Sequence, residues 1–296
     1  MNLTTNSREV LEAAFESWGM WEAQFTAEPV DLRVTVQEEG DLALEPEFRT
    51  REHLFSVVAD RHNYAVMDLD RLIGHAYVSR KTAADHAWFR WYFLDTMGLF
   101  LISQRHVAAV HAACVAREGA GILLGGESYA GKSTLAWACA RAGWTYVGDD
   151  STWLTAEGTG REVLGRPHSV RFRHDAPLLF PELSGYLSRV RPNGKLSIEV
   201  LTSEFSNIRT ASRCEALALV FLDRSGRGTP GFERVPARDA VDELLGSTPL
   251  YRPQLRRRHH ALIKRLLRQA PAWRMRYKSL EEGIALLGEL HRDLRA

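Results

Sequence analysis

The sequence predicts an α/β protein in which a central mixed or parallel sheet is flanked by helices. Two observations carry this prediction. From residue 104 on, short apolar segments with the character of buried strands alternate with helical segments, and one strand enters a helix through a glycine-rich loop. A small α+β region precedes this core over residues 1–103, where an amphipathic helix is followed by alternating strands. We therefore expect a domain boundary near residue 103 and a main domain over 104–296.

The amino-terminal region begins with a predicted helix over residues 7–23. Asn6 suits the N-cap position, Glu9 follows three residues later, and apolar residues recur at helical spacing. Residues 25–80 alternate apolar and polar side chains, which predicts a small, mostly antiparallel β region. The aromatic and aliphatic run over 85–103 predicts a long helix whose stripe belongs to the hydrophobic core.

The main domain opens with apolar segments at 106–116 and 121–126, which have the length of buried strands. The second segment runs into a loop and a helix, after which Gly143 stands where a C-terminal cap is expected. A further strand, over 145–150, ends in two acids. Later strands are predicted at 168–173, 196–201 and 216–222, helices at 237–246 and 254–269, and a last strand and helix within 274–291.

The composition excludes several classes of protein. The chain has 296 residues, of which 45% are hydrophobic and 25% charged, and its formal net charge is +1. Near-neutrality argues against a nucleic-acid or membrane-surface binder. Three widely spaced cysteines form neither a disulfide framework nor a metal knot. There is no signal-peptide pattern, and the apolar run at 88–102 is interrupted by charges and too short to span a bilayer. We expect a cytoplasmic protein.

Residues 126–133, GESYAGKS, match the phosphate-binding pattern G-x-x-x-x-G-K-[ST]. The glycines let the backbone wrap around phosphates, and the following helix presents its positive end. Lys132 is expected to reach the β- and γ-phosphates, and the Ser133 hydroxyl to ligate Mg²⁺. The alternative is a glycine-rich strand-to-helix turn that binds no nucleotide. We predict a nucleoside triphosphate site, with these nucleotide-binding residues: Gly126, Glu127, Ser128, Tyr129, Ala130, Gly131, Lys132, Ser133 and Thr134.

Asp149 and Asp150 end the predicted strand that follows the helix of the loop. In a βαβ unit both loops open at the carboxyl edge of the sheet, so the acids would face the phosphates. One carboxylate can hold Mg²⁺, and the other can accept a proton from an attacking hydroxyl. His111 lies in the apolar segment before the loop strand, where a core role and a catalytic role are both open. The alternative for Asp149 and Asp150 is an acidic pair in a solvent-exposed turn without a catalytic role.

The series VHAACVA, GILLGGESYAGKSTLA and GWTYVGDD resembles the catalytic core of HPr kinase/phosphorylase and its small kinase relatives. The resemblance is specific over residues 106–150, looser through 166–173, 193–196 and 216–223, and does not cover 1–80. It implies a P-loop kinase fold, ATP with Mg²⁺ as donor, and a serine hydroxyl as acceptor. It also leaves a homo-oligomer open, because family members often form oligomers.

Residue by residue, the resemblance implies that Asp149 is the base and Asp150 the metal partner, with the two roles open to exchange. His111 would orient or polarise the site, and Lys132 would serve catalysis at the phosphates. Tyr129 departs from the family, which usually has a glycine there. Neither the amino-terminal domain of the HPr-specific enzymes nor their dephosphorylation signature is recognisable. The chain therefore matches diverged relatives that act on other hydroxyls, such as a peptide serine or a small molecule.

Further cations are candidates for contacts with the phosphates or the acceptor, or are ordinary surface residues: Arg171, Arg173, Arg191 and Lys195. The basic run at 256–268 suits an acidic partner, but its leucines fall on one helical face, which favours a solvated helix surface. The leading function is a hydroxyl-directed, ATP- and Mg²⁺-dependent kinase. The alternatives are a nucleotide-gated binding protein without turnover and, third, a true bifunctional HPr kinase/phosphorylase.

Overall fold

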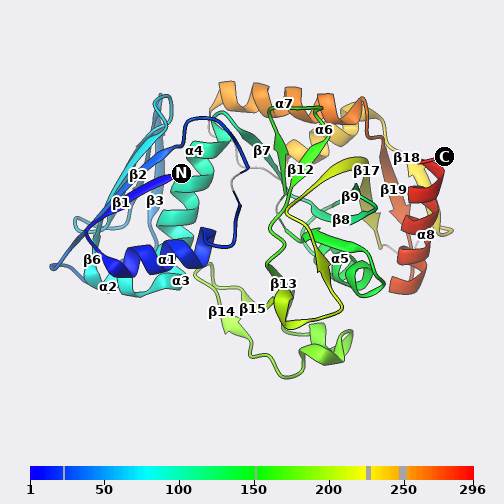
Figure 1. Cartoon of the computed structure of the whole chain (residues 1–296), viewed down its shortest axis with the longest axis horizontal. Coiled ribbons are helices and arrows are strands. Elements are labelled where there is room, and N and C mark those ends of the chain that lie inside the picture. The colour runs from blue at the N-terminus through cyan, green and yellow to red at the C-terminus, as the bar shows by residue number, and fades with distance from the viewer. Residues whose placement is uncertain (23, 151, 225–227, 247–251) are drawn as a thin grey trace. The chain divides into compact units, whose positions relative to one another are not determined.

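The computed structural model describes residues 1–22, 24–150, 152–224, 228–246 and 252–296. The chain divides into two compact units. Unit 1 comprises Met1–Val107 together with Arg191–Lys195, and unit 2 comprises Ala108–Val190 together with Leu196–Ala296. In Figure 1 most of unit 1 is coloured blue to cyan, and most of unit 2 runs from green to red.

The described residues of unit 1 form a six-stranded sheet in the order β1-β2-β6-β5-β4-β3. Neighbours from β6 to β3 are antiparallel, as expected, whereas β1, β2 and β6 run parallel to one another, so the sheet is mixed. The first strand, before the helix, was not predicted. The strands are β1 (Asn2–Thr5), β2 (Asp31–Gln37), β3 (Glu47–Arg51), β4 (Leu54–Val58), β5 (Tyr64–Asp68) and β6 (Ile73–Ser79).

The first helix of unit 1 is shorter than the predicted span of 7–23 and is not capped by Asn6. The Asn6 side chain instead bonds both the backbone N–H and the carbonyl of Val36, at 2.8 and 2.9 Å, so Ser7 takes the N-cap position. The predicted helix over 85–103 forms with a π-helical turn inside it, at Arg90–Leu94. The helices are α1 (Arg8–Trp18), α2 (Arg80–Ala84), α3 (His86–Phe89) and α4 (Asp95–Ser103).

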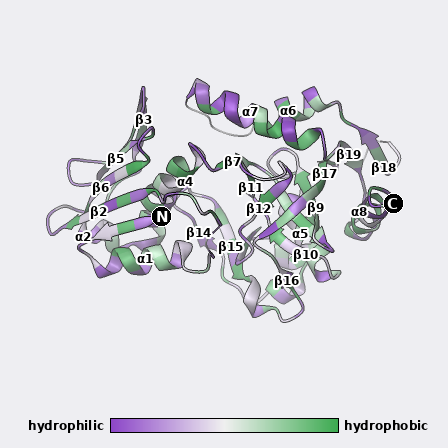
Figure 2. Ribbon diagram, turned by 45° about the horizontal axis from the view of Figure 1, so that its top comes forward, coloured by the Kyte–Doolittle hydropathy of each residue, from purple (hydrophilic) through white to green (hydrophobic). Residues whose placement is uncertain are grey.

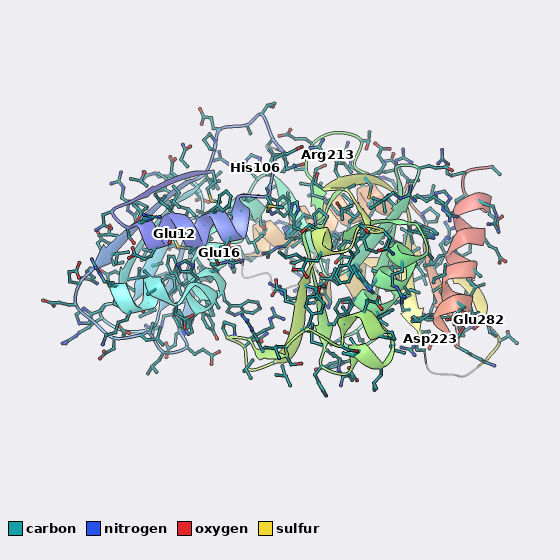
Figure 3. All side chains as sticks on the ribbon, turned by 60° about the horizontal axis from the view of Figure 1, so that its bottom comes forward. Glu12, Glu16, His106, Arg213, Asp223 and Glu282 are labelled. Carbon is teal, nitrogen blue, oxygen red and sulfur yellow. The ribbon has the colours of Figure 1, made fainter. Side chains whose placement is uncertain are left out.

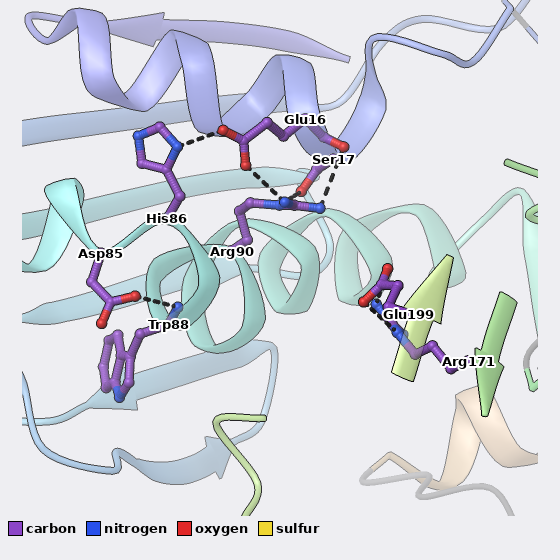
Figure 4. A network of polar contacts seen from close by, with 8 residues as sticks. All are labelled: Glu16, Ser17, Asp85, His86, Trp88, Arg90, Arg171 and Glu199. Atoms are coloured by element: carbon purple, nitrogen blue, oxygen red, sulfur yellow. Dashed lines mark hydrogen bonds and ion pairs between the residues drawn. The ribbon is translucent and has the colours of Figure 1, made fainter. Parts of the chain in front are cut away.

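Unit 1 has its own hydrophobic core between one face of its sheet and these helices. Alternate residues of β2 and β6 are buried, and they pack with α1 and with the aromatic stripe of the 86–103 segment. Figure 4 shows a polar link between the helices: Glu16 of α1 lies 2.6 Å from His86 Nδ1 and accepts a 2.8 Å bond from Arg90. The aromatic stripe of the 86–103 segment belongs to the hydrophobic core of unit 1, as predicted.

The described part of unit 2 contains a ten-stranded mixed sheet. The path β16-β10-β8-β9-β17 continues on one branch through β12, β11 and β7 and on the other through β19 and β18. Its strands are β7 (Val107–Val110), β8 (Ala113–Arg117), β9 (Ala120–Gly125), β10 (Thr145–Gly148), β11 (Thr152–Thr155), β12 (Glu162–Leu164), β16 (Arg209–Thr210), β17 (Arg213–Asp223), β18 (Gly231–Arg234) and β19 (Ala272–Arg276). A smaller sheet, seen within the described residues, comprises β13 (Ser169–Arg173), β14 (Arg189–Val190) and β15 (Leu196–Leu201).

Helices cover both faces of this large sheet. One face packs against α5, α8 and the small sheet, and the other packs against α6 and α7. The helices are α5 (Lys132–Arg141), α6 (Ala237–Gly246), α7 (Pro253–Leu267) and α8 (Leu280–Asp293), with short 3₁₀ turns at Ala176–Leu178, Pro181–Leu183 and Thr202–Glu204. In Figure 2 the central strands are coloured largely as hydrophobic, whereas the ribbon of α7 is coloured largely as hydrophilic. The predicted α/β class, a mixed sheet flanked by helices, is confirmed.

Two strand predictions in unit 2 need correction. The segment 106–116 is not one strand, because the chain leaves β7 at Val110 and re-enters the sheet as β8 at Ala113, with His111 in the break. The strand predicted at 145–150 ends at Gly148, so both acids lie just beyond it. The predicted cap is present: Gly143 has φ +88°, and its N–H donates to the Ala140 carbonyl at 3.0 Å.

A tight hairpin joins β8 to β9 at the end of the strands opposite the loop. Arg117 pairs with Ala120, which leaves the two-residue turn Glu118–Gly119 with φ of +51° and +79°. Both positive values are those of the turn that matches the natural twist of antiparallel strands.

The basic face of α7 is exposed while His259, Ile263, Leu266 and Leu267 are buried. In the described part of the chain, no helix has the length and apolar character needed to cross a bilayer.

Candidate active site

The sheet topology of unit 2 brings three separate segments to one edge. β8 lies between β9 and β10 and is antiparallel to both. The amino end of β8 therefore meets the carboxyl ends of β9 and β10. His111 precedes β8, residues 126–131 follow β9, and Asp149 with Asp150 follows β10. The expected convergence of loop and acids occurs, although β9 and β10 are not direct neighbours.

The glycine-rich loop uses backbone conformations that favour glycine at both of its ends. Gly126 has φ +134° and Gly131 φ +94°, the latter immediately before α5. The loop ends at the N-terminus of α5, where the first backbone N–H groups have no partner within the helix and are suited to binding an anion. Ser133 and Thr134 are half-buried in this first turn. The segment has the arrangement that a phosphate chain needs.

Lys132 is folded back over the loop. Its side chain is 6% exposed, and Nζ donates to the carbonyls of Gly126 at 2.8 Å and Glu127 at 3.0 Å. Burial lowers the pKa of the Lys132 ammonium, and the nearby charge of Asp150 opposes that shift. The carbonyl contacts hold the ammonium at the mouth of the loop, where a phosphate oxygen would be a stronger acceptor.

Tyr129 occupies the outer part of the loop with φ +72°, a left-handed conformation that costs a non-glycine residue energy. Its side chain is 73% exposed. The guanidinium of Arg173, at the end of β13, lies 5.2 Å from the ring centroid, within range of a cation–π contact. This conformation gives a physical reason why glycine would be favoured at the position.

Asp149 is half-buried and anchored to the small sheet. Its Oδ2 accepts the backbone N–H of Arg171 at 2.9 Å. Burial raises the pKa of Asp149 to about 6, although the Arg171 N–H acts in the opposite direction; the charge of Asp150 adds to the rise. A carboxyl that titrates near 6 can take up a proton under nearly neutral conditions.

Asp150 and His111 form a more exposed pair. His111 Nδ1 lies 3.4 Å from Asp150 Oδ1, and Asp150 acts electrostatically on Lys132. The break between β7 and β8 places the imidazole beside this carboxylate, outside the ladder of the sheet. His111 is therefore not a buried core residue.

The predicted cationic contacts are arranged differently from one another. The Arg171 side chain pairs with the Glu199 carboxylate at 3.1 Å, as Figure 4 shows, so its link to Asp149 is through the backbone. Arg173 lies over Tyr129 and near Asp175, at 3.7 Å. Lys195 belongs to the segment Arg191–Lys195 of unit 1 and is not among the residues gathered here.

Sequence reasoning missed Arg224, which follows β17 on the other side of the loop strand. β17 is parallel to β9, so its carboxyl end lies at the same edge as the loop. The usable signal was its position two residues after the apolar strand predicted at 216–222, because residues just beyond strand ends gather at this edge of the sheet.

The oxygen donors at this edge fit a magnesium ion that is shared with phosphates. Among the described residues, no three His, Cys, Asp or Glu side chains are grouped to hold a metal by themselves. Mg²⁺ is usually held by one or two protein oxygens together with substrate phosphates and water. The Ser133 hydroxyl and the exposed Asp150 carboxylate supply that kind of donor set.

Comparison with known proteins gives a distant structural relation. No protein-family model matches the chain, and no curated protein matches it in sequence. Among solved structures, the chain is similar to the HPr(Ser) kinase/phosphatase from Coxiella burnetii, with a TM-score of 0.34 and 13% identity. The similarity covers 64% of this chain and 96% of that structure.

Proposed function

We propose that this chain is an ATP- and Mg²⁺-dependent kinase that transfers the γ-phosphoryl group to a hydroxyl, with a serine of a peptide or protein, or a small molecule, as acceptor. The observation that carries the proposal is the shared sheet edge, where a phosphate-binding loop faces a carboxyl with a pKa of about 6 and a second, exposed carboxylate. A loop alone would hold a triphosphate; the acids add a means of activating an acceptor.

The loop residues would hold the phosphates through their backbone N–H groups and the positive end of α5. Lys132 would exchange its two carbonyl contacts for oxygens of the β- and γ-phosphates. Its place at the first turn of α5 keeps the ammonium within reach of both. These groups stabilise the negative charge of the phosphoryl group during transfer.

Asp149 would act as the base. The acceptor hydroxyl oxygen forms a bond to the γ-phosphorus, the bond from that phosphorus to the β–γ bridging oxygen breaks, and ADP leaves. The hydroxyl proton passes to Asp149, whose raised pKa matches that task. The Arg171 N–H would hold Oδ2 of this carboxylate in position, and in the proposed reaction the other oxygen of Asp149 would take up the proton.

Ser133 and Asp150 would hold the magnesium ion, which when bound neutralises phosphate charge and orients the phosphate chain. His111 would position Asp150, because its ring nitrogen lies beside one carboxylate oxygen and limits how that group can turn. We assign the kinase reaction to unit 2, whose bounds differ from the expected 104–296 because residues up to Val107 and Arg191–Lys195 belong to unit 1, and we assign no separate reaction to unit 1.

The test is transfer of labelled phosphate from ATP to a panel of hydroxyl acceptors: serine and threonine peptides, free amino acids, sugars and nucleosides. We expect Lys132→Ala to abolish transfer and to weaken ATP binding, while Lys264→Ala, on the exposed face of α7, changes neither. Asp149→Asn should bind ATP normally and lose at least about a hundredfold in rate. Transfer that survives Lys132→Ala would refute the proposal.

The same variants distinguish a nucleotide-gated binding protein from a kinase. Asp149 contacts Arg171 and Asp150 contacts His111. These contacts are compatible with a nucleotide-gated switch as well as with a kinase, so the variants have to separate the two. A switch binds ATP, transfers phosphate to none of the acceptors, and keeps its function in Asp149→Asn. Phosphorolysis of a phosphorylated acceptor by inorganic phosphate, which forms pyrophosphate and frees the hydroxyl, would instead indicate the bifunctional reaction.

A further inference from the structure

Arg224 lies against the phosphate loop on the side away from the acids. It directly follows β17, which pairs with β9 in parallel, and Phe221 of β17 is opposite Gly125. A Cβ on Gly131 would lie 3.4 Å from both Cδ and Nη1 of Arg224, so the arginine side chain passes over the last loop residue before α5. The Arg224 side chain is exposed to solvent.

The neighbouring acid does not share this direction. Asp223, labelled in Figure 3, ends β17 and its carboxylate lies 3.3 Å from Arg276 Nε at the end of β19. Alternate residues of β17 face opposite sides of the sheet, with Leu222 in the core beneath α5 and Phe221 in the core beneath α6 and α7. Arg224 is thus the side chain from this strand end that reaches the loop.

The ring of Tyr277 lies next to the Arg224 guanidinium. The centroid of its ring lies 5.8 Å from Arg224 Cζ, and its hydroxyl lies 3.5 Å from the position of a Cβ on Gly131. Tyr277 is 3% exposed, and among the described residues its hydroxyl has no hydrogen-bond partner. The guanidinium therefore lies within cation–π range of an aromatic ring, and the arginine remains exposed to solvent.

The two sides of the loop differ in chemistry. On the β8 and β10 side lie His111, Asp149 and Asp150. In the proposed reaction these residues act at the γ-phosphate end of the nucleotide. On the β17 and β19 side lie Arg224, a cation, and Tyr277, an aromatic ring, while Asp223 of the same strand end pairs with Arg276. If the γ-phosphate is delivered to the acids, the nucleoside end of the same molecule leaves the loop on the opposite side.

We propose that Arg224 stacks on the base of the bound nucleotide, forming a layered arrangement of Tyr277 ring, guanidinium and base. This inference rests on the proposed function only for nucleotide binding and for the direction of the γ-phosphate. A planar guanidinium stacks on aromatic faces, which a lysine ammonium does not do in the same way. Because every base has such a face, stacking recognises purines without reading their edges. The site takes adenine and guanine nucleotides with similar affinity.

The test compares binding of ATP, GTP and inorganic tripolyphosphate by calorimetry with the full chain. In the unchanged protein, ATP and GTP should bind within about threefold of each other, since stacking is tolerant of the base. Arg224→Ala should weaken both by about tenfold or more and leave tripolyphosphate unchanged. Arg224→Lys should behave like the alanine variant, because it keeps the charge and loses the plane.

Arg234 provides a matched control. Its guanidinium lies 4.7 Å from the ring centroid of Trp273, it is exposed, and it stands on β18 beside the opposite end of β19. Arg234→Ala removes an equivalent arginine–aromatic contact away from the loop and should change none of the three affinities. It also reports any general effect of losing such a contact on the fold.

Three outcomes overturn the proposal: equal weakening of ATP and tripolyphosphate in Arg224→Ala, full binding by Arg224→Lys, or unchanged ATP binding in both variants. Failure of the kinase proposal looks different. Nucleotides would then bind and depend on Arg224 as stated, while no acceptor receives phosphate. Conversely, transfer that depends on Lys132 but not on Arg224 would uphold the kinase and refute the stacking arrangement.

Discussion

His111 Nδ1 and Asp150 Oδ1 lie 3.4 Å apart at one edge of the unit 2 sheet, one before the start of β8 and the other after the end of β10. Antiparallel β8 makes this meeting possible, because its beginning is level with the ends of the strands on both sides. Under the proposed function, this contact would hold the Asp150 carboxylate in place for the magnesium ion.

The first prediction concerns magnesium. His111→Ala removes the ring that limits the motion of the Asp150 carboxylate, so we expect the magnesium concentration for half-maximal transfer to rise by about tenfold. The maximal rate at saturating magnesium should change less. Titration of the initial rate with Mg²⁺ measures both, and His260→Ala on α7 is the control. An unchanged magnesium requirement would contradict the positioning role.

The second prediction concerns the pH dependence of transfer. Asp149 has a pKa of about 6, so it is protonated below that pH and cannot accept the proton of the acceptor. A plot of kcat/KM against pH should therefore fall on its acidic side with an inflection near 6. Asp149→Asn should lose most of the rate together with this inflection. Asp175→Asn, which alters an exposed acid near Arg173, should retain both.

The third prediction concerns stability and follows from the same titration. The pKa of Asp149 is higher in the folded protein than its ordinary value of 3.8, so folding favours its protonated form. That stabilisation is present below about pH 4 and is lost as the pH rises through 6. The free energy of unfolding of Asp149→Asn, relative to the unchanged protein, should therefore increase by about 2–3 kcal/mol from pH 4 to pH 8. Urea unfolding at several pH values measures the difference; a constant difference would contradict it.

The fourth prediction concerns strain in the loop at Tyr129. Tyr129→Gly relieves the positive φ, whereas Tyr129→Ala keeps it and removes the contact with Arg173. We expect the glycine variant to be more stable than the alanine variant by about 1 kcal/mol, despite the greater backbone entropy of glycine. Urea denaturation of both proteins checks this. Equal stabilities would show that the loop relaxes when the ring is removed.

The fifth prediction concerns Gly121 in the middle of the sheet. A Cβ at this position would overlap Cys214 Sγ and lie 3.4 Å from Cys114 Sγ, because these two side chains meet over the glycine. Gly121→Ala should lower the free energy of unfolding by about 1–3 kcal/mol, as overpacking does. Adding Cys214→Ala should recover part of the loss.

Gly185 is the control for that experiment. A Cβ there would meet nothing within 4 Å, and its backbone needs no positive φ. Gly185→Ala should therefore leave the free energy of unfolding within about 0.5 kcal/mol of the unchanged protein. If Gly121→Ala is equally neutral, the packing over β9 is looser than the contact between the two sulfur atoms indicates.

Local signals predicted the elements of unit 2 well. The strand before the loop, helix α5 with its Gly143 cap, and the last strand and helix form close to the expected residues, because each depends on short-range periodicity and capping. The edge shared by the loop and the acids was predictable for the same reason, since strand ends can be read from the sequence.

Features that depend on distant partners were not predictable. Asn6 looked like a helix cap but bonds Val36 across the sheet, and this alternative exists only once β2 is in place. The break at His111 is hidden in an unbroken apolar run. The contact of Arg171 with Asp149 is made by a backbone N–H, so no residue type could reveal it.

The two-residue turn Glu118–Gly119 has a consequence for sequence change in this protein. It fixes which residue of β8 stands opposite which residue of β9, and so sets the position of the histidine relative to the loop from the opposite end of both strands. A single inserted residue at this exposed tip would slide or bulge one strand and turn alternate side chains to the wrong face. The length of this turn thus helps to fix the geometry of the site. A protein engineer who chooses a surface loop to carry a tag should leave this turn intact.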